Sequence, residues 1–147
     1  MKTQYLLPLG ALLLASTAFA GEHRYTLSPA YVAECGSCHV AYPPALLSAP
    51  AWAATMQGLG KHFGSDASLD AKNQREIGDW LQAQASTRDK HAVSGKTPRL
   101  TESTWFRKEH RGLSLPPKTT SLAQCNACHT RAEQGDFGEG SLKSNRR

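Results

Sequence analysis

The sequence predicts a mainly α fold, made of short helices and loops with little or no sheet. Apolar residues recur at helical spacing in several segments, and no segment shows the sustained period-two alternation of a half-buried strand. The candidate core is thin, because large aliphatic residues are few and the aromatic residues are scattered. Two short cysteine motifs indicate that bulky attached groups complete this core, since a domain with so little apolar mass needs such support.

The first twenty residues have the features of an export signal. Lys2 provides a positive start, residues 5–14 are largely apolar, and Ala18-Phe19-Ala20 is a small-x-small cleavage pattern. The apolar stretch is shorter than the ~20 residues that span a bilayer, which argues against an uncleaved anchor. No later segment is apolar enough for stable membrane insertion. We therefore expect a signal peptide, residues 1–20, cleaved after Ala20, and a single exported domain, residues 21–147.

All four cysteines of the chain belong to C-x-x-C-H strings. The strings consist of Cys35, Cys38 and His39, and of Cys125, Cys128 and His129. This is the attachment pattern of c-type haem. Both thiols of one string add to vinyl groups of the same porphyrin, and the histidine that follows becomes the proximal iron ligand. Two disulfides or a structural zinc ion are the alternatives, but neither requires a histidine after the second cysteine. The sequence thus predicts helices packed around two covalently bound haems.

The first two helices expected between the strings lie within residues 48–85. Ser48 and Pro50 are typical of a helix start, and Gly64 is typical of a helix end. Between them an apolar stripe recurs at helical spacing, formed by Trp52, Met56, Leu59 and Phe63. A second helix is expected from about residue 69 to residue 85, opened by Ser68.

The remaining chain predicts one more helix and several loops. A short helix is expected from Glu102 to about His110, capped by Thr101 and closed by Gly112. Residues 86–98 are polar and predict a surface loop. The segment that follows Gly112 contains two adjacent prolines and must be extended.

Each iron needs a second axial ligand besides its proximal histidine. The candidates are His23, His62, His91, His110 and Met56. His62 borders the apolar stripe, and His110 lies four residues after Phe106, on the same helix face. Such histidines are more often core residues, but here two irons must be covered. His91 lies in the polar loop and is expected to be solvated. Met56 and His23 stay open as alternatives, because methionine is a common axial ligand and His23 lies close to the new N-terminus.

Four stretches of the chain together resemble the small periplasmic dihaem cytochrome c family, often called DHC. They read ECGSCH-x-AYPP, W-x-x-x-M-x-x-L-x-x-HFG-x-x-ASLD, R-x-T-x-x-x-WF-x-x-EH and C-x-x-CH-x-x-AE-x-GDF. The resemblance extends from Tyr31 to Phe137 and is far more specific than C-x-x-C-H alone. The chain departs from the family pattern in one respect, since Ser141 to Arg147 lacks the proline that often follows GDF, which leaves the docking of this tail open.

The resemblance implies more than the attachment of haem. The family's histidines in HFG and EH map onto His62 and His110, so both haems are expected to be bis-histidine ligated and of low potential. It also implies electron delivery to an SHP-type oxygen-binding haem protein, with a b-type membrane cytochrome as the donor.

Composition and ligand supply favour an electron carrier over other classes. The chain has 17 Lys and Arg against 12 Asp and Glu without a clustered basic stripe, which argues against nucleic-acid binding. A haem enzyme of the peroxidase or reductase type, or a gas-binding haem protein, is the alternative and needs one open iron site. Because enough histidines are present to close both irons, we expect a periplasmic cytochrome that is not an enzyme and that transfers electrons between redox proteins.

Overall fold

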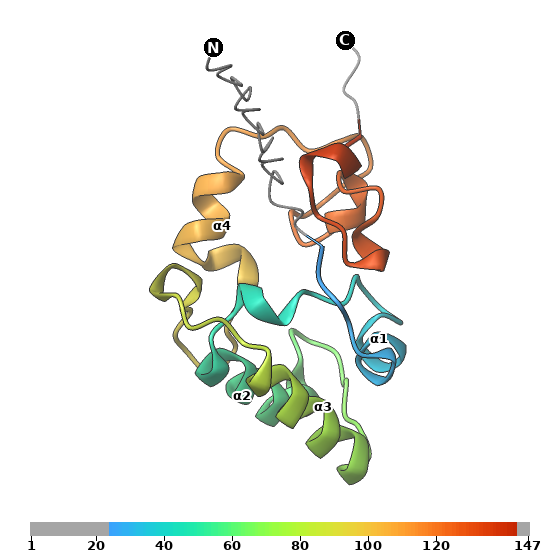
Figure 1. The fold of residues 1–147 in the computed structure, drawn as a ribbon, viewed down its shortest axis with the longest axis vertical. Helices are drawn as coiled ribbons and strands as arrows, with labels where there is room; N and C mark the ends of the chain where they lie inside the picture. Colours follow the sequence, from blue (N-terminus) through green and yellow to red (C-terminus); the bar gives the residue numbers. More distant parts are fainter. Residues whose placement is uncertain (1–23, 144–147) are drawn as a thin grey trace, which may run out of the picture.

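The computed structural model describes residues 24–143, and these residues form α-helices, 3₁₀ helices and loops (Figure 1). The α-helices are α1 (Pro29–Cys35), α2 (Ala49–Gln57), α3 (Ala71–Ala83) and α4 (Thr104–Glu109). No strand occurs within the described range, where β pairing is limited to isolated bridges such as that between Arg24 and Asp136. The prediction of a mainly α fold with little or no sheet is confirmed.

Helix α1 was not expected from the sequence, and it ends on the first cysteine. Ser28 precedes it in an extended conformation, and Pro29 occupies the first turn, where a fixed φ and a missing N–H cost nothing. Tyr31 is its one buried residue. A side chain on Gly36, the residue after the helix, would collide with the Val32 carbonyl oxygen, so position 36 favours glycine.

Helix α2 starts as predicted but ends earlier. Ser48 and Pro50 lie at its N-terminus, whereas Gly58 is already its C-cap, and the Gly58 N–H donates to the Ala54 and Thr55 carbonyls. The chain then continues as a 3₁₀ turn, Leu59–Lys61. Glycine weakens a helix interior by about 1 kcal/mol, and α2 ends at the first glycine of this segment. The predicted stripe therefore loses Phe63, whose side chain is 42% exposed.

The starts of α3 and α4 are displaced from their predicted caps. Asp70, not Ser68, caps α3, because its Oδ1 accepts from Lys72 N (2.9 Å) and Asn73 N (3.0 Å). Ser103, not Thr101, caps α4, and its Oγ accepts from Phe106 N at 3.1 Å. In both cases the residue that satisfies the free N–H groups of the first turn sets the boundary.

The main core joins α1, α2 and α3. Helices α2 and α3 lie side by side at one end of the molecule (Figure 1) and pack closely. The ring of Tyr31 from α1 meets Trp52 at 6.3 Å and Trp80 at 5.2 Å between centroids. The Trp52 indole donates to the Pro44 carbonyl at 2.8 Å, which ties the chain after the first string to α2. Within residues 24–143, no helix combines the length and apolar character needed to cross a membrane.

The final segment is tied down by a buried carboxylate. The side chain of Asp136 is 5% exposed and pairs with Arg131 at 2.7 Å and with Arg24 at 3.5 Å. The Gly138 N–H donates to the same carboxylate at 3.0 Å. Gly135, just before it, has a φ of +75°, and a side chain there would strike the Tyr25 carbonyl oxygen.

We expect Asp136→Asn to destabilise the protein. The Gly138 N–H, followed by Arg131 and Arg24, holds the pKa of Asp136 below its ordinary value. A carboxylate with a depressed pKa contributes stability above the unfolded-state pKa of about 3.9, and the contribution is lost as pH falls through the folded pKa. The melting temperature of the haem-loaded variant should therefore drop by several degrees at pH 7, and the difference should shrink below pH 4.

The matched control is Asp79→Asn on an exposed face of α3. It should leave the melting temperature nearly unchanged at both pH values. An equal loss in both variants would show that Asp136 has no special role.

Candidate haem-binding sites

The first C-x-x-C-H string lies where α1 gives way to a turn. Cys35 is the last residue of α1, and Cys38 and His39 follow on the turn. His39 Nδ1 lies 2.7 Å from the Val40 carbonyl oxygen. A carbonyl only accepts, so Nδ1 carries the proton and the Nε2 lone pair is left for a metal. The turn thus presents two thiols and one metal-binding nitrogen.

His62 begins a turn with an unusual backbone conformation. Phe63 and Gly64, which follow it, have φ values of +50° and +99°. The chain reverses there, and Ser65 N–H donates to the His62 carbonyl at 3.0 Å. A left-handed conformation costs a residue such as phenylalanine roughly 1–2 kcal/mol, and such strain is concentrated at functional sites.

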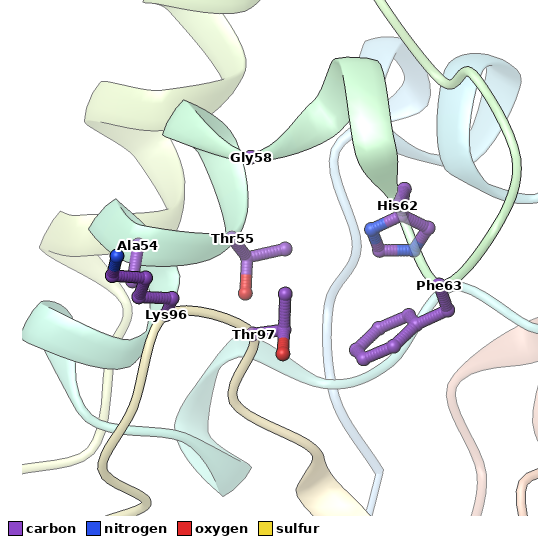
Figure 2. A pocket seen from close by; sticks show the side chains of 7 residues that line it. All are labelled: Ala54, Thr55, Gly58, His62, Phe63, Lys96 and Thr97. Atoms are coloured by element: carbon purple, nitrogen blue, oxygen red, sulfur yellow. The ribbon is translucent and has the colours of Figure 1, made fainter.

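A small cavity and the side chain of Arg99 lie beside this turn. Figure 2 shows His62 and Phe63 beside a small cavity of about 10 Å³, with Thr55 and Thr97 across from them. The Arg99 guanidinium lies 4.0 Å from the centre of the Phe63 ring, a cation–π contact. Arg99 therefore packs on the strained turn that carries His62.

His39 and His62 face each other across a cleft large enough for a bulky ligand. Their ring centres are 6.2 Å apart, with 24° between the planes. Two imidazoles that bind one metal from opposite sides at about 2 Å have ring centres on the order of 6 Å apart. The cleft they line measures about 980 Å³, at the upper end of ligand-binding cavities. Its apolar wall includes Tyr31, Leu47, Trp52, Met56, Leu59, Leu81 and Leu100.

The charge state of His62 suits metal binding. Burial, followed by the neighbouring His39 and Arg99, lowers the pKa of His62. A neutral imidazole is the form that ligates a metal. The two rings and the two thiols of the first string thus line one cleft, and they fit a covalently attached haem.

The second C-x-x-C-H string begins in a 3₁₀ turn, Cys125–Ala127. Its histidine is held by a backbone bond, His129 N–H to the Cys125 carbonyl at 2.8 Å. A later part of the chain clamps the turn, because Lys143 N–H donates to the Cys128 carbonyl at 2.8 Å. His129 Nδ1 is buried without a hydrogen-bond partner.

His110 ends α4 next to this second turn. Its Nδ1 lies 3.0 Å from the Phe106 carbonyl oxygen, and its ring stacks on the Phe106 ring at 3.9 Å. The rings of His110 and His129 are 6.4 Å apart with 65° between their planes. Burial, followed by His110, lowers the pKa of His129, which favours its neutral form. The second pair thus has nearly the spacing of the first: the His62 ring lies near His39, and the His110 ring lies near His129.

No disulfide joins any of the four cysteines. Burial raises the pKa of the Cys35 and Cys125 thiols to about 11. Within the described residues, no group of three or more His, Cys, Asp or Glu side chains gathers as a metal-ion site.

The remaining ligand candidates are placed differently. Met56 is buried at the cleft wall and lies close to Gly78. His23 lies outside the described residues. The expectation that His91 is solvated was wrong: its side chain is 5% exposed, its Nδ1 lies 2.7 Å from Ser86 Oγ, and its ring meets Trp105 at 5.0 Å. Trp105 from α4 covers the polar loop, a tertiary contact that the loop's composition does not reveal.

Tyr42, for which the sequence predicts no role, lies against the first site. Its ring stacks on His39 at 4.8 Å, with 22° between the planes. Its hydroxyl donates to the Ala123 carbonyl at 3.2 Å, beside the second string. Burial raises the pKa of Tyr42 to about 12, so the hydroxyl stays a donor. Only its place in the AYPP run, three residues after His39, hints at a role.

Comparisons with known proteins agree with this arrangement. The family model for dihaem cytochrome c matches residues 31–137. A DHC crystal structure from Rhodobacter sphaeroides is 40% identical and covers 77% of this chain and 99% of its own, with a TM-score of 0.65. A dihaem cytochrome c structure from the same organism is 37% identical and covers 78% and 99%, with a TM-score of 0.69.

A third solved structure comes from another organism. The dihaem c-type cytochrome of Shewanella baltica is 36% identical and covers 78% of this chain and 90% of its own, with a TM-score of 0.67. A comparison with curated proteins gave no match.

Proposed function

This chain belongs to the dihaem cytochrome c family and binds two covalent c-type haems, and from that premise we propose that it carries electrons between protein partners in the periplasm. The observation that carries the proposal is the pairing of imidazoles at both sites. Centroid separations of 6.2 Å and 6.4 Å suit two axial ligands on each iron. When bound, each haem supplies a one-electron iron couple.

Each attachment string and its paired histidine form one proposed haem site. In the first, Cys35 and Cys38 form the thioether links, and His39 and His62 are the axial ligands. In the second, the corresponding residues are Cys125, Cys128, His129 and His110. The carbonyls of Val40 and Phe106 orient His39 and His110 by accepting from Nδ1.

This ligand set supports a carrier and argues against an enzyme. With both axial positions of each iron taken by histidine, no position is left for a substrate or a gas. Histidine also lacks the upward effect of a methionine ligand on the potential, so both haems should be of low potential. Such a carrier suits the reduction of a downstream haem protein.

Location and partners follow from the leader and from the family. We propose that residues 1–20 direct export and are removed after Ala20, which leaves one dihaem domain, residues 21–147. An SHP-type oxygen-binding haem protein is the proposed acceptor, and a b-type membrane cytochrome is the proposed donor. Without Lys2 of the leader, residues 21–147 contain 16 Lys and Arg against 12 Asp and Glu, and this modest positive charge of +4 favours an acidic partner surface.

Stopped-flow mixing tests this function. The reduced protein should transfer electrons rapidly to an SHP-type haem protein at low ionic strength. Because salt screens the attraction between opposite charges, the rate should fall about tenfold or more at high ionic strength. Peroxide and nitrite, assayed in parallel, should not be turned over. Slow transfer at both ionic strengths, together with real turnover of either compound, would instead identify an enzyme.

A further inference from the structure

One side chain links the two haem sites directly. Tyr42 stacks on the His39 ring on one side, and its hydroxyl reaches the Ala123 carbonyl on the other. Ala123 lies two residues before Cys125, the first thiol of the second string, and 81 residues from Tyr42 in sequence. A single residue thus contacts a proposed ligand of one haem and the backbone that leads into the attachment turn of the other.

The backbone of Tyr42 is itself fixed from several directions. The hydroxyl of the buried Tyr31 donates to the Tyr42 carbonyl at 2.9 Å. Pro43 and Pro44 follow directly, and their rings restrict φ. Pro44 in turn accepts the Trp52 indole N–H at 2.8 Å. The ring of Tyr42 is therefore anchored to the main core and is not free to follow a moving imidazole.

The receiving side is a short turn that is held by hydrogen bonds between residues close in sequence. Ala123 N–H donates to Ser121 Oγ at 3.1 Å, and Gln124 Oε1 accepts from Thr120 N–H at 2.8 Å. Both bonds are local and exposed, so they hold the shape of the turn but not its distance from the first site. The bond from Tyr42 is a long-range contact that joins this turn to the core.

We propose that Tyr42 is a positioning residue that sets the plane of the His39 imidazole and holds the second attachment turn at a fixed place relative to the first haem. The stacked ring limits rotation of the imidazole, and the hydroxyl bond couples the two sites. The inference rests on the proposed ligation of iron by His39. The ring of Tyr42 orients His39, and the hydroxyl of Tyr42 holds the second attachment turn.

Two substitutions separate the two tasks. Tyr42→Phe keeps the ring and removes the hydroxyl, whereas Tyr42→Leu removes the aromatic stack as well. Tyr25→Phe is the matched control, because it removes a phenol hydroxyl from a ring that packs on Phe137 instead. All variants are studied as the haem-loaded protein.

Two measurements report separately on the orientation of His39 and on the anchoring of the second attachment turn. Low-temperature electron paramagnetic resonance of the oxidised protein reports the orientation of the axial ligands through the g values. Hydrogen exchange reports local opening at the amides of Gln124 and Ala127, which donate to the Ser121 and Gln124 carbonyls. Tyr42→Phe should keep the wild-type g values and raise this exchange about 2- to 10-fold, the factor that one net hydrogen bond is worth. Tyr42→Leu should raise the exchange and also shift the g values of one haem.

The outcomes distinguish this inference from the proposed ligation. If the wild-type spectrum lacks bis-histidine low-spin signals for the first haem, the ligand assignment itself fails. If those signals are present but Tyr42→Leu leaves them unchanged, the positioning of His39 is refuted. If exchange in Tyr42→Phe equals that of the wild type and of Tyr25→Phe, the coupling of the two sites is refuted.

Discussion

Without its haems, most of the chain should be unfolded. The cleft beside the first string measures about 980 Å³ and is lined by core residues such as Tyr31, Trp52 and Leu81. Without the haem, the apolar wall of the cleft would border water instead of the porphyrin, and the full burial of one large apolar side chain is worth about 1.5–3 kcal/mol. A few such side chains already amount to the lower end of the whole stability of a domain, about 5–15 kcal/mol. The haem is therefore part of the core rather than an addition to it.

Two double substitutions test this expectation one haem at a time. Cys35→Ala with Cys38→Ala prevents attachment of the first haem, and Cys125→Ala with Cys128→Ala prevents attachment of the second. The first pair should abolish most of the helical circular dichroism, because the cleft borders the core of α1, α2 and α3. The second pair should cost less helix, because α4, which leads into His110, is only 6 residues long. A haem-free chain with sharp tertiary signals and full helix content would contradict the prediction.

The site was more predictable from the sequence than the boundaries of the fold. The C-x-x-C-H strings identify the haem c chemistry because thiols and histidine must meet the porphyrin at fixed spacing. His62 and His110 were placed by helix-face reasoning, and both lie within ring-contact distance of the histidines of the strings. Their ligation of iron stays a prediction.

The failures have more than one physical origin. Helix α1 has seven residues and one buried side chain, too few for a periodic pattern. Phe63 was assigned to an apolar stripe, but Gly58 ends α2 and a left-handed turn carries Phe63 to the surface under Arg99. His91 lies in a polar segment whose composition predicts solvent, yet Trp105 buries it. Ser28 and Pro29 are a local signal for the start of α1, and Gly58 is a local signal for the end of α2. The burial of His91 has no local signal, because its partner Trp105 lies elsewhere in the chain.

Replacing either distal histidine should open one iron to carbon monoxide. The reduced wild-type protein should bind none, because both irons are closed by histidine. His62→Ala and His110→Ala should each bind carbon monoxide at one haem, with a shifted Soret band. The ring centres of the paired histidines are 6.2 Å and 6.4 Å apart, so an iron between them is held by both imidazoles. The methyl group of alanine is too short to reach that iron and has no atom that could bind it. The titration of carbon monoxide into each reduced variant gives the stoichiometry directly.

Two controls make this experiment decisive, because each removes a rival explanation. Met56→Leu keeps the volume of a residue at the cleft wall, so it should cost less than about 1.5 kcal/mol and leave both haem spectra unchanged. His91→Ala removes a buried imidazole, so it should lower the stability by roughly 1–3 kcal/mol while both irons stay closed. Loss of stability and opening of an iron are thereby separated. If Met56→Leu perturbed a haem spectrum and neither distal histidine variant bound carbon monoxide, methionine would be the ligand and the bis-histidine assignment would be wrong for that haem.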